Sequence, residues 1–382
     1  MSVKLKFGNP VAIAYGPSYE EVGWGPYQFP HAVRLDDGRI AVNFSDCPDT
    51  MDAYGSEAAW CVSADEGRTW TRVTDPEERR LITCMSGLKL PSGKRLRSDT
   101  QPPVKLDPEL YAALKKKTNR WKPCLGMEEI PDGIIEKFKW HMAIYDPETD
   151  TDEKFLADVD WPTMTTSLAT DSIVRPMPFA MAHVAPDGSI WQAHYWDGRN
   201  PDNGGFTNYY ALYFFRSTDE GRSYKLMSWI QYVPDSYEFK DAFQVEGFCE
   251  QDFAFMPDGS VITLMRTDSR TPSFIARSTD GAKSWSKPVI FDKCGVLPKL
   301  LYLKCGATIA SYGRPGLFVR ATDDPSGQVW DDAYELMPYD APHTSCYYTS
   351  LLEIDEHTAL LFYSDWTDGQ KNICCRTVTV ES

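Results

Sequence analysis

The amino-acid sequence predicts an all-β protein that forms a six-bladed β-propeller, with residues 1–382 as a single domain. Two repeated patterns support this prediction: an octapeptide that recurs along the chain, and six apolar segments that are each divided by a tight turn. A third observation is that helical periodicity is nearly absent, since the best helix candidate is the short segment Pro108–Lys117.

The octapeptide has the composition of a tight hairpin turn. Its Asp and Ser side chains bond nearby backbone amides, its Gly accepts a positive φ, and its closing aromatic residue packs the turn onto the sheet. One copy would be a weak signal, but several copies in one chain indicate a repeated architecture. Three good copies are Ser63–Trp70, Ser217–Tyr224 and Ser278–Trp285, and a looser one runs from Ala321-Thr322-Asp323 through Gly327 to Trp330.

The six divided segments each predict a strand, a short turn of the Asp-Gly type and a second strand. Four of them are followed by the octapeptide hairpin, so each unit supplies about four strands. Six such units joined head to tail predict a propeller, which exposes only short sheet edges. The segments are Val33–Val42, Leu88–Leu96, Ala182–Trp191, Phe253–Leu264, Leu300–Ile309 and Leu351–Phe362, where Glu356 and His357 replace the turn glycine of the last one.

The second unit is interrupted by an irregular region, predicted to be an insertion at about residues 97–160. This region carries a basic cluster (Lys115, Lys116, Lys117) and then an acidic one between Asp146 and Glu153. It is interpreted either as a decoration of the second blade with a solvated face or as a flap over the central cavity.

The composition excludes several classes of function. A net charge of -16 argues against nucleic acid and anionic membranes as partners. No apolar run approaches the roughly 20 residues of a membrane span, and no signal peptide precedes the first predicted strand. The ten scattered cysteines are interpreted as reduced thiols, which predicts a cytoplasmic location. The six histidines lack metal-ligand spacing and the sequence has no nucleotide-binding signature, so neither a metal nor another cofactor is expected.

The octapeptides and the count of six units resemble the Asp-boxes and the propeller of the sialidase (neuraminidase) superfamily. The resemblance covers most of the chain outside residues 97–160. It implies that the Asp-boxes are structural elements at outer turns. It also implies that functional side chains lie on the innermost strands, just before each Asp-Gly turn, and point into a central funnel.

The fourth unit matches the family at two positions. Sialidases carry a glutamate on the first strand of this hairpin and an arginine on the second, and Glu250 and Arg266 occupy these places. Glu246 is the alternative glutamate. An ordinary cross-strand ion pair, worth little if exposed, is the competing interpretation of Glu250 and Arg266.

The sixth unit contains the candidate nucleophile. The family's nucleophilic tyrosine opens the corresponding strand, and Tyr348 fits this position better than Tyr347. A free phenol has a pKa of about 10 and is a poor nucleophile at neutral pH. A nearby carboxylate, here Glu250, would take its proton as attack begins. Tyrosine is the known exception to the carboxylate nucleophile of retaining glycosidases, and it avoids repulsion with an acidic substrate.

The resemblance further implies arginines that clamp a substrate carboxylate and an aspartate that acts as acid and base. Arg266 and Arg314 match two clamp positions, with Arg320 as a competitor for the latter, and guanidinium forks suit a carboxylate. The aspartate belongs on the loop after the first inner hairpin. Asp52 lies closest to the family position, and Asp49 and Asp46 are alternatives.

One position departs from the family. The first clamp arginine should stand where this chain has Gln28, within Tyr27-Gln28-Phe29-Pro30-His31. The clamp is therefore reduced to two arginines unless Arg34 or a residue of the insertion compensates. The Gln28 amide can bond a hydroxyl as readily as a carboxylate, and His31 adds a side chain that titrates near neutrality.

The function predicted on this basis is a retaining, sialidase-like exo-glycosidase that acts on a terminal, acidic sugar of a glycan. Sialic acid or a related 2-keto-3-deoxy sugar competes with arabinofuranose or a rhamnose–glucuronate unit, which other propeller hydrolases or lyases handle. A non-catalytic glycan-binding propeller is the alternative from a different class. Loss of the first arginine favours binding alone, whereas Asp52, Glu250 and Tyr348 together favour catalysis.

Overall fold

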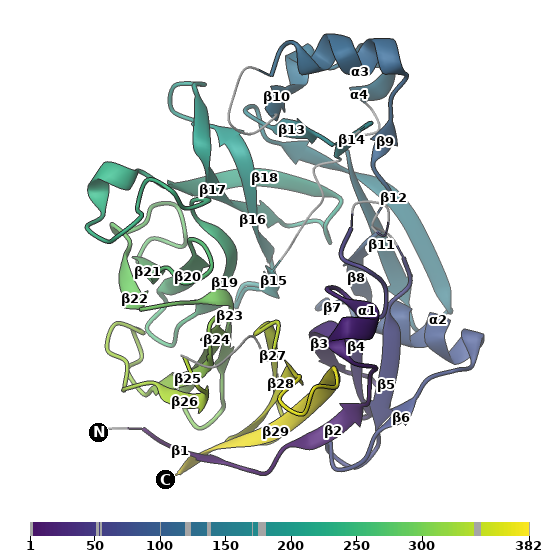
Figure 1. The fold of residues 1–382 in the computed structure, drawn as a ribbon, viewed down its shortest axis with the longest axis vertical. Helices are drawn as coiled ribbons and strands as arrows, with labels where there is room; N and C mark the ends of the chain where they lie inside the picture. Colours follow the sequence, from purple (N-terminus) through teal and green to yellow (C-terminus); the bar gives the residue numbers. More distant parts are fainter. Residues whose placement is uncertain are drawn as a thin grey trace.

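The computed structural model is a ring of six antiparallel blades around a central axis, which confirms the predicted all-β six-bladed propeller (Figure 1). It describes residues 3–50, 53, 56–99, 101–118, 124–135, 139–169, 171–174, 181–339 and 345–381. Within these residues, no helix combines the length and apolarity needed to cross a membrane.

Each blade is a four-stranded antiparallel sheet whose first strand lies innermost. The first blade contains β3 (Gln28–Arg34), β4 (Ile40–Ser45), β5 (Ala59–Ser63) and β6 (Thr71–Arg72); the second contains β7 (Leu88–Lys89), β8 (Arg95–Ser98), β11 (Trp140–Asp146) and β12 (Thr151–Asp160); the third contains β15 (Met181–Val184), β16 (Ile190–Arg199), β17 (Phe206–Ser217) and β18 (Ser223–Gln231). The fourth contains β19 (Cys249–Phe255), β20 (Val261–Arg266), β21 (Ser273–Ser278) and β22 (Val289–Asp292); the fifth contains β23 (Val296–Tyr302), β24 (Thr308–Gly313), β25 (Leu317–Thr322) and β26 (Tyr334–Met337); the sixth contains β27 (Thr349–Glu353), β28 (Thr358–Asp365) and β29 (Asn372–Glu381), completed by β1 (Lys4–Phe7) and β2 (Val11–Ala14).

All six predicted hairpins join the first two strands of a blade. Their five turn glycines adopt φ between 82° and 95°, a conformation that glycine reaches without steric cost. The sixth turn places His357 where the others have glycine, and its backbone still closes with the bond from the Ile354 N–H to the Thr358 carbonyl. The hairpin register is therefore the same around the ring.

The octapeptides form the turns between the third and fourth strands of four blades. In the first copy, the Ser63 hydroxyl accepts the Gly67 N–H at 2.9 Å and Asp65 accepts the Thr69 N–H at 2.8 Å. The looser copy departs from the sequence interpretation, because Asp324 rather than Asp323 takes the Asp65 role. Its carboxylate accepts the backbone N–H groups of three residues, namely Ser326, Gln328 and Val329.

The insertion in the second blade has different limits from those predicted. Residues 140–160 belong to the blade itself, because β11 and β12 pair continuously from Trp140↔Ala157 to Asp146↔Thr151 and bury β11 in the core. The additional residues form a separate sheet of β10 (Cys124–Gly126), β13 (Thr165–Leu168), β14 (Ser172–Val174) and β9 (Val104–Lys105), with α3 (Pro108–Lys115) and α4 (Asp132–Ile135) beside it (Figure 1). The predicted helix at Pro108–Lys117 is thus confirmed as α3. The remaining helices, α1 (Tyr19–Val22) and α2 (Pro76–Met85), lie in loops around the first blade.

The second and third blades are joined into one eight-stranded sheet. Residues Asp158–Asp160 of β12 pair in parallel with Ser223–Lys225 of β18. An aromatic core that includes Trp140 and Trp161 packs between the two blades. This part of the ring is therefore continuous in both backbone hydrogen bonds and packing.

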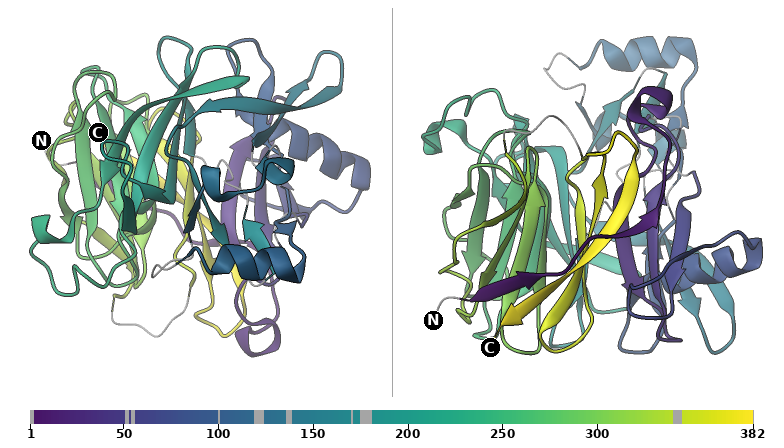
Figure 2. Two further views of the ribbon diagram at one scale, coloured as in Figure 1. Left: turned by 90° about the horizontal axis from the view of Figure 1, so that it is seen from above. Right: turned by 60° about the horizontal axis from the view of Figure 1, so that its bottom comes forward.

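The ring is closed by the two ends of the chain. Strands β1 and β2 pair one after the other with the outer edge of β29, so the N-terminal segment completes the sixth blade. Figure 2 shows the purple N-terminal strand crossing beside the yellow C-terminal strands, with both termini close together. Val3 and Leu5 are buried against the fifth and sixth blades, which adds apolar contacts to this closure.

Candidate active site

The innermost strands of three blades share a β-bulge at the end nearest the candidate site. The pairing register shifts by one residue between Gln28 and His31, between Cys249 and Asp252, and between Val296 and Lys299. In each bulge, the second residue of the shifted segment has a positive φ. These residues are Phe29, Glu250 and Leu297. Such bulges re-aim side chains and concentrate at functional sites.

Tyr348, Glu250 and Arg266 meet at the inner ends of the fourth and sixth blades. The Tyr348 hydroxyl donates to Glu250 Oε1, and Arg266 pairs with the same oxygen at 2.6 Å. The other oxygen of Glu250 accepts the Leu297 backbone N–H from the fifth blade at 3.2 Å. The side chains of Glu250 and Arg266 are each only 10% exposed, whereas Tyr348 is half-buried and accessible.

The surroundings keep Tyr348 protonated at neutral pH. Burial and the neighbouring Glu250 carboxylate raise the pKa of its phenol well above the ordinary value, and Arg266 and Arg314 oppose this effect. Burial acts to lower the pKa of Arg266, but Glu250 and other acidic neighbours raise it above its usual range. The arrangement is therefore a neutral phenol that hydrogen bonds to a carboxylate, beside a permanently charged guanidinium.

Arg266 is surrounded by carboxylates. In addition to Glu250, it lies 3.4 Å from Glu246 and 3.8 Å from Asp268. Glu246, the alternative to Glu250, therefore contacts the same arginine, while the Tyr348 hydroxyl donates its hydrogen bond to Glu250. A substrate carboxylate approaching Arg266 would compete with three protein carboxylates.

Arg314 lies between two aromatic rings at the mouth of the site. Its guanidinium is 5.1 Å from the centre of the Tyr348 ring and 5.3 Å from that of Trp24, within the range of cation–π attraction. It donates to the Cys346 carbonyl at 2.9 Å. The Phe29 ring contacts the Tyr348 ring on another side, with the ring centres 4.9 Å apart.

Three alternatives from the sequence lie elsewhere. Arg320 donates to the backbone carbonyls of Asp331 and Phe291 near the turn of the fourth octapeptide. Arg314 is therefore the one of these two arginines that lies beside Tyr348. Tyr347 is buried in the core between the fifth and sixth blades. Arg34 forms a two-pronged pair with Glu66 near the surface and does not replace the missing clamp arginine.

Gln28 occupies a different position from the one expected of a substrate-binding residue. Its side chain is completely buried, and its Oε1 accepts the Gly25 backbone N–H at 2.7 Å. Its Nε2 has no hydrogen-bond partner among the residues that the structure describes. The bulge that follows Gln28 inverts the strand alternation, so the amide fastens the loop before β3 instead of facing solvent.

The loop that should carry the acid is only partly described, and Asp52 lies outside the described residues. Asp46 pairs with Arg72 of the outer strand β6 at 3.0 Å. Asp49 accepts the Trp24 indole N–H at 3.0 Å and borders, together with Phe29, a small cavity of about 210 Å³. Of the two described alternatives, Asp49 is the one connected to the site through Trp24 and Arg314.

His31 lies on the innermost strand of the first blade and is exposed to solvent in the central channel, although the channel walls surround its imidazole ring. Burial by the surrounding channel wall and the charge of Lys299 lower its pKa to about 4, so the imidazole is neutral at neutral pH.

Three residues near the site were not anticipated from the sequence, namely Trp24, Tyr195 and Lys299. Burial and the Glu250 charge raise the pKa of Tyr195, which places this third-blade residue near the site.

Lys299 could have been found from the hairpin pattern. It stands seven residues before its turn glycine, Gly306, as His31 does before Gly38 and Asp252 before Gly259. Trp24 gave no comparable signal, because it lies in a loop rather than in the repeated hairpins.

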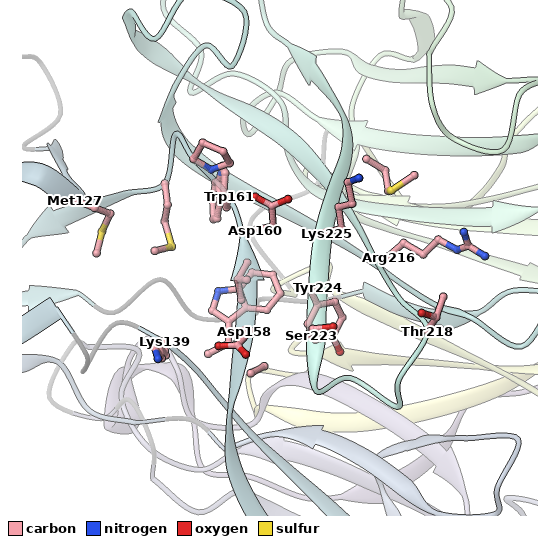
Figure 3. Close-up of a pocket in the computed structure, with 16 residues that line it drawn as sticks. Met127, Lys139, Asp158, Asp160, Trp161, Arg216, Thr218, Ser223, Tyr224 and Lys225 are labelled. Carbon is pink, nitrogen blue, oxygen red and sulfur yellow. The ribbon is translucent and has the colours of Figure 1, made fainter.

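Another cavity is separate from these residues. It has a volume of about 860 Å³ and lies outside the inner strands, where β12 meets β18 (Figure 3). Its wall includes Trp140, Trp161 and Tyr224, and its rim carries Lys139 and Asp160. It contains none of the residues around Tyr348.

Neither metal ligands nor disulfides accompany the site in the described part of the chain. There, no three His, Cys, Asp or Glu side chains are grouped as a metal would require. All ten cysteines are free thiols.

The sequence matches no family model and no curated protein. Several solved structures are similar in fold. A protein of unknown function from Dyadobacter fermentans has a TM-score of 0.64 at 16% identity, with 99% of each chain covered. The α-L-arabinanase of Penicillium chrysogenum, complexed with arabinobiose, has a TM-score of 0.52 at 12% identity, with 98% of each chain covered. The NanB sialidase of Streptococcus pneumoniae has a TM-score of 0.51 at 13% identity, covering 97% of this chain and 70% of that one. At these identities the similarity establishes the fold alone.

Proposed function

We propose that this protein is a retaining exo-glycosidase that removes a terminal, acidic sugar from a glycan, with Tyr348 as nucleophile and Glu250 as its base. The observation that carries the proposal is the hydrogen bond from the Tyr348 hydroxyl to the Glu250 carboxylate, in a site that Arg266 and Arg314 also reach. The fold supports it, since two of the similar structures are an arabinanase and a sialidase.

In the first step, Tyr348 Oη bonds to the anomeric carbon while the bond to the leaving oxygen breaks. The phenolic proton passes to Glu250 Oε1, which already accepts it as a hydrogen bond. Arg266 stabilises the carboxylate before transfer and the tyrosine oxygen as its charge develops. The product of this step is a glycosyl–tyrosine intermediate.

The leaving oxygen takes its proton from an aspartic acid of the loop after β4, where Asp52 and Asp49 are the candidates. In the second step the same aspartate accepts a proton from water, which attacks the anomeric carbon. Glu250 returns its proton to Tyr348 as the covalent bond breaks. Two displacements at one carbon retain the configuration of the sugar.

The test begins with aryl glycosides of sialic acid, Kdn, arabinofuranose, rhamnose and glucuronic acid, offered to the purified protein. The sugar that turns over is then prepared as a fluorinated glycosyl fluoride, which forms the intermediate quickly and releases it slowly. Intact mass should increase by one glycosyl unit, located on the Tyr348 peptide. Tyr348→Phe, which keeps the ring packing, should stay folded and gain no mass.

A label on a carboxylate would reassign the nucleophile, most directly to Glu250. Binding of a glycan without turnover of any glycoside would instead support the non-catalytic alternative. Asp52→Ala and Asp49→Ala distinguish the acid, because loss of the true acid slows substrates with poor leaving groups more than activated ones.

A further inference from the structure

The inner strands place equivalent residues at one level of the central channel. Because the hairpins share one turn geometry, residues at the same distance from the turn occupy the same height. The first level contains the residues nine positions before the turn residue of their hairpin, and it includes the candidate nucleophile and base. These residues are Phe29, Glu250, Leu297 and Tyr348. The second level lies further along the strands and contains the residues seven positions before the turn residue. These residues are His31, Met181, Asp252, Lys299 and Ser350.

Lys299 reaches across this second level. Its Nζ lies 2.9 Å from the Met181 sulfur, although Lys299 belongs to the fifth blade and Met181 to the third. Its charge also acts on His31 of the first blade. Lys299 is only 8% exposed, whereas His31 on the same level is exposed, so solvent reaches the channel beside a nearly buried ammonium.

No carboxylate among the described residues lies within ion-pair distance of this ammonium. The two carboxylates whose charges act on Lys299, those of Asp252 and Glu250, already accept hydrogen bonds from other donors. Asp252 accepts His183 and the backbone N–H groups of Phe253 and Leu300, each at 2.9 Å. Glu250 accepts Tyr348, Arg266 and the Leu297 N–H.

The contact that Lys299 makes with Met181 does not compensate its charge, because a thioether is a weak acceptor. An ammonium withdrawn from water without an anion is strongly destabilising. Burial lowers the pKa of Lys299 from its ordinary value, whereas Asp252 and Glu250 act to raise it. Such a group is suited to receive an anion from outside the protein.

We propose that Lys299 is an anion-binding residue of this site and receives the carboxylate of the terminal sugar. It thereby provides the positive charge that the buried Gln28 does not, while Arg266 is engaged by three carboxylates. The neutral His31 imidazole adds a hydrogen-bond donor at the same level. The inference rests on the proposed function for the location of the sugar, but its test measures binding and not turnover.

The experiment measures binding to the full-length protein by calorimetry. The probes are N-acetylneuraminate and glucuronate as sugar acids, glucose as a neutral sugar, and inorganic phosphate. Lys299→Met removes the charge at similar volume, and Lys299→Gln is a second neutral variant if the methionine variant does not fold. Lys304→Met is the matched control, since Lys304 follows the same strand and pairs with Glu353 at the surface.

We expect at least one sugar acid to bind the native protein more tightly than glucose. Its affinity should fall about 10- to 150-fold in the neutral Lys299 variants, the value of a hydrogen bond to a charged group, and remain unchanged in Lys304→Met. Tyr348→Phe should retain the binding. If the native protein binds the acid through Lys299 but hydrolyses no glycoside, the proposed activity fails while the anion site stands.

Three results would overturn the inference. The first is the absence of sugar-acid binding, and the second is binding that the neutral Lys299 variants leave intact. The third is a response to phosphate alone, which would assign Lys299 to a free inorganic anion and not to a substrate carboxylate.

Discussion

At the scale of single residues, the chemistry depends on backbone conformations that few side chains adopt. Glu250 has φ of 43° at a bulge, and the equivalent Phe29 and Leu297 have φ of 59° and 38°. Each such residue costs on the order of 1–3 kcal/mol, and the paired strands on either side hold it in place. As a result, the Glu250 carboxylate and the Phe29 ring face Tyr348, and the Leu297 backbone N–H faces Glu250.

The role of Glu250 as a base predicts a specific loss in Glu250→Gln. The amide keeps the size and a hydrogen bond to Tyr348 but cannot take its proton, so kcat should fall about 10²–10⁴-fold. Steady-state kinetics on the best aryl glycoside measure this, with circular dichroism to verify folding. Glu246→Gln is the control, because Glu246 contacts Arg266 without the bond to tyrosine. An equal effect of the two changes would contradict the assignment.

The burial of Gln28 predicts that an arginine at this position will not form part of a carboxylate clamp. Gln28→Arg would place a charge in a fully buried position beside Gly25, costing about 3 kcal/mol or more of unfolding free energy. Denaturant titration measures the loss, with the neutral Gln28→Met expected to lose less. A stable Gln28→Arg protein with increased sialoside turnover would show that this side chain can turn toward the substrate.

The buried His194 predicts how stability depends on pH. Burial lowers its pKa from 6.5 to about 3, so between these values the unfolded chain binds a proton that the folded protein does not. Stability from this residue is therefore present above pH 6.5 and is lost as pH falls, by at most about 1.4 kcal/mol per pH unit. Denaturant titrations from pH 7 to pH 4 should show a weaker pH dependence for His194→Phe. Parallel curves for the two proteins would refute the prediction.

The candidate site was predictable where the hairpin register determines it. Glu250, Arg266, Arg314 and Tyr348 lie together because their distances from repeated turns fix their height and face. The same reasoning misjudged Gln28, since a bulge that the sequence does not mark reverses its direction. Trp24 was missed for another reason: it comes from the loop before β3, whose path depends on tertiary contacts with Asp49 and Arg314.

At the scale of elements, the octapeptides form tight turns as predicted, but the fourth copy was misaligned. Two extra residues in the fourth copy left the aspartate position ambiguous, and the structure selects Asp324 because three backbone N–H groups converge on it. The insertion was misjudged for a related reason. The strand pair of residues 140–160 has a charged outer strand with little alternation, so it resembled a solvated segment.

The role of Asp324 in the fourth octapeptide turn predicts unequal effects for two adjacent aspartates. Asp324→Ala leaves backbone donors of one turn without their acceptor and should lower the free energy of unfolding by about 1–3 kcal/mol. Asp323→Ala, at an exposed neighbouring position, should cost less than half as much. Thermal and chemical denaturation of the two variants compare them directly. A larger loss of stability in Asp323→Ala than in Asp324→Ala would instead assign the role of Asp65 to Asp323.

At the scale of the whole molecule, the six repeats predicted the ring but not how it closes. No octapeptide follows the sixth hairpin, so the sequence does not state which segment supplies the last strand. The structure assigns this place to β1 and β2, which pair with β29. A closure between segments at opposite ends of the chain leaves no local pattern.

Closure by the first strand predicts a large effect of a small change near the N-terminus. Leu5→Ala removes a buried side chain between two blades and should cost about 2–4 kcal/mol. Lys6→Ala, the next residue on the same strand, faces outward and should change stability by less than about 0.5 kcal/mol. Denaturant titration gives both values. Equal, small effects would indicate that β1 contributes little to the closed ring.

The same closure constrains the order in which the protein can be completed during synthesis. Arg376 donates to the Gly8 carbonyl across 368 residues of sequence, so the segment that contains β1 is synthesised long before β29, the strand with which it pairs. At translation rates of about 5–20 residues per second, β1 waits roughly 20–70 s for its partner. During this interval it is an unpaired strand edge, and the outward lysines at positions 4 and 6 are of the kind that discourages pairing with other chains. Strand β1 thus closes the ring by pairing with β29, and it is exposed to misassembly throughout this interval.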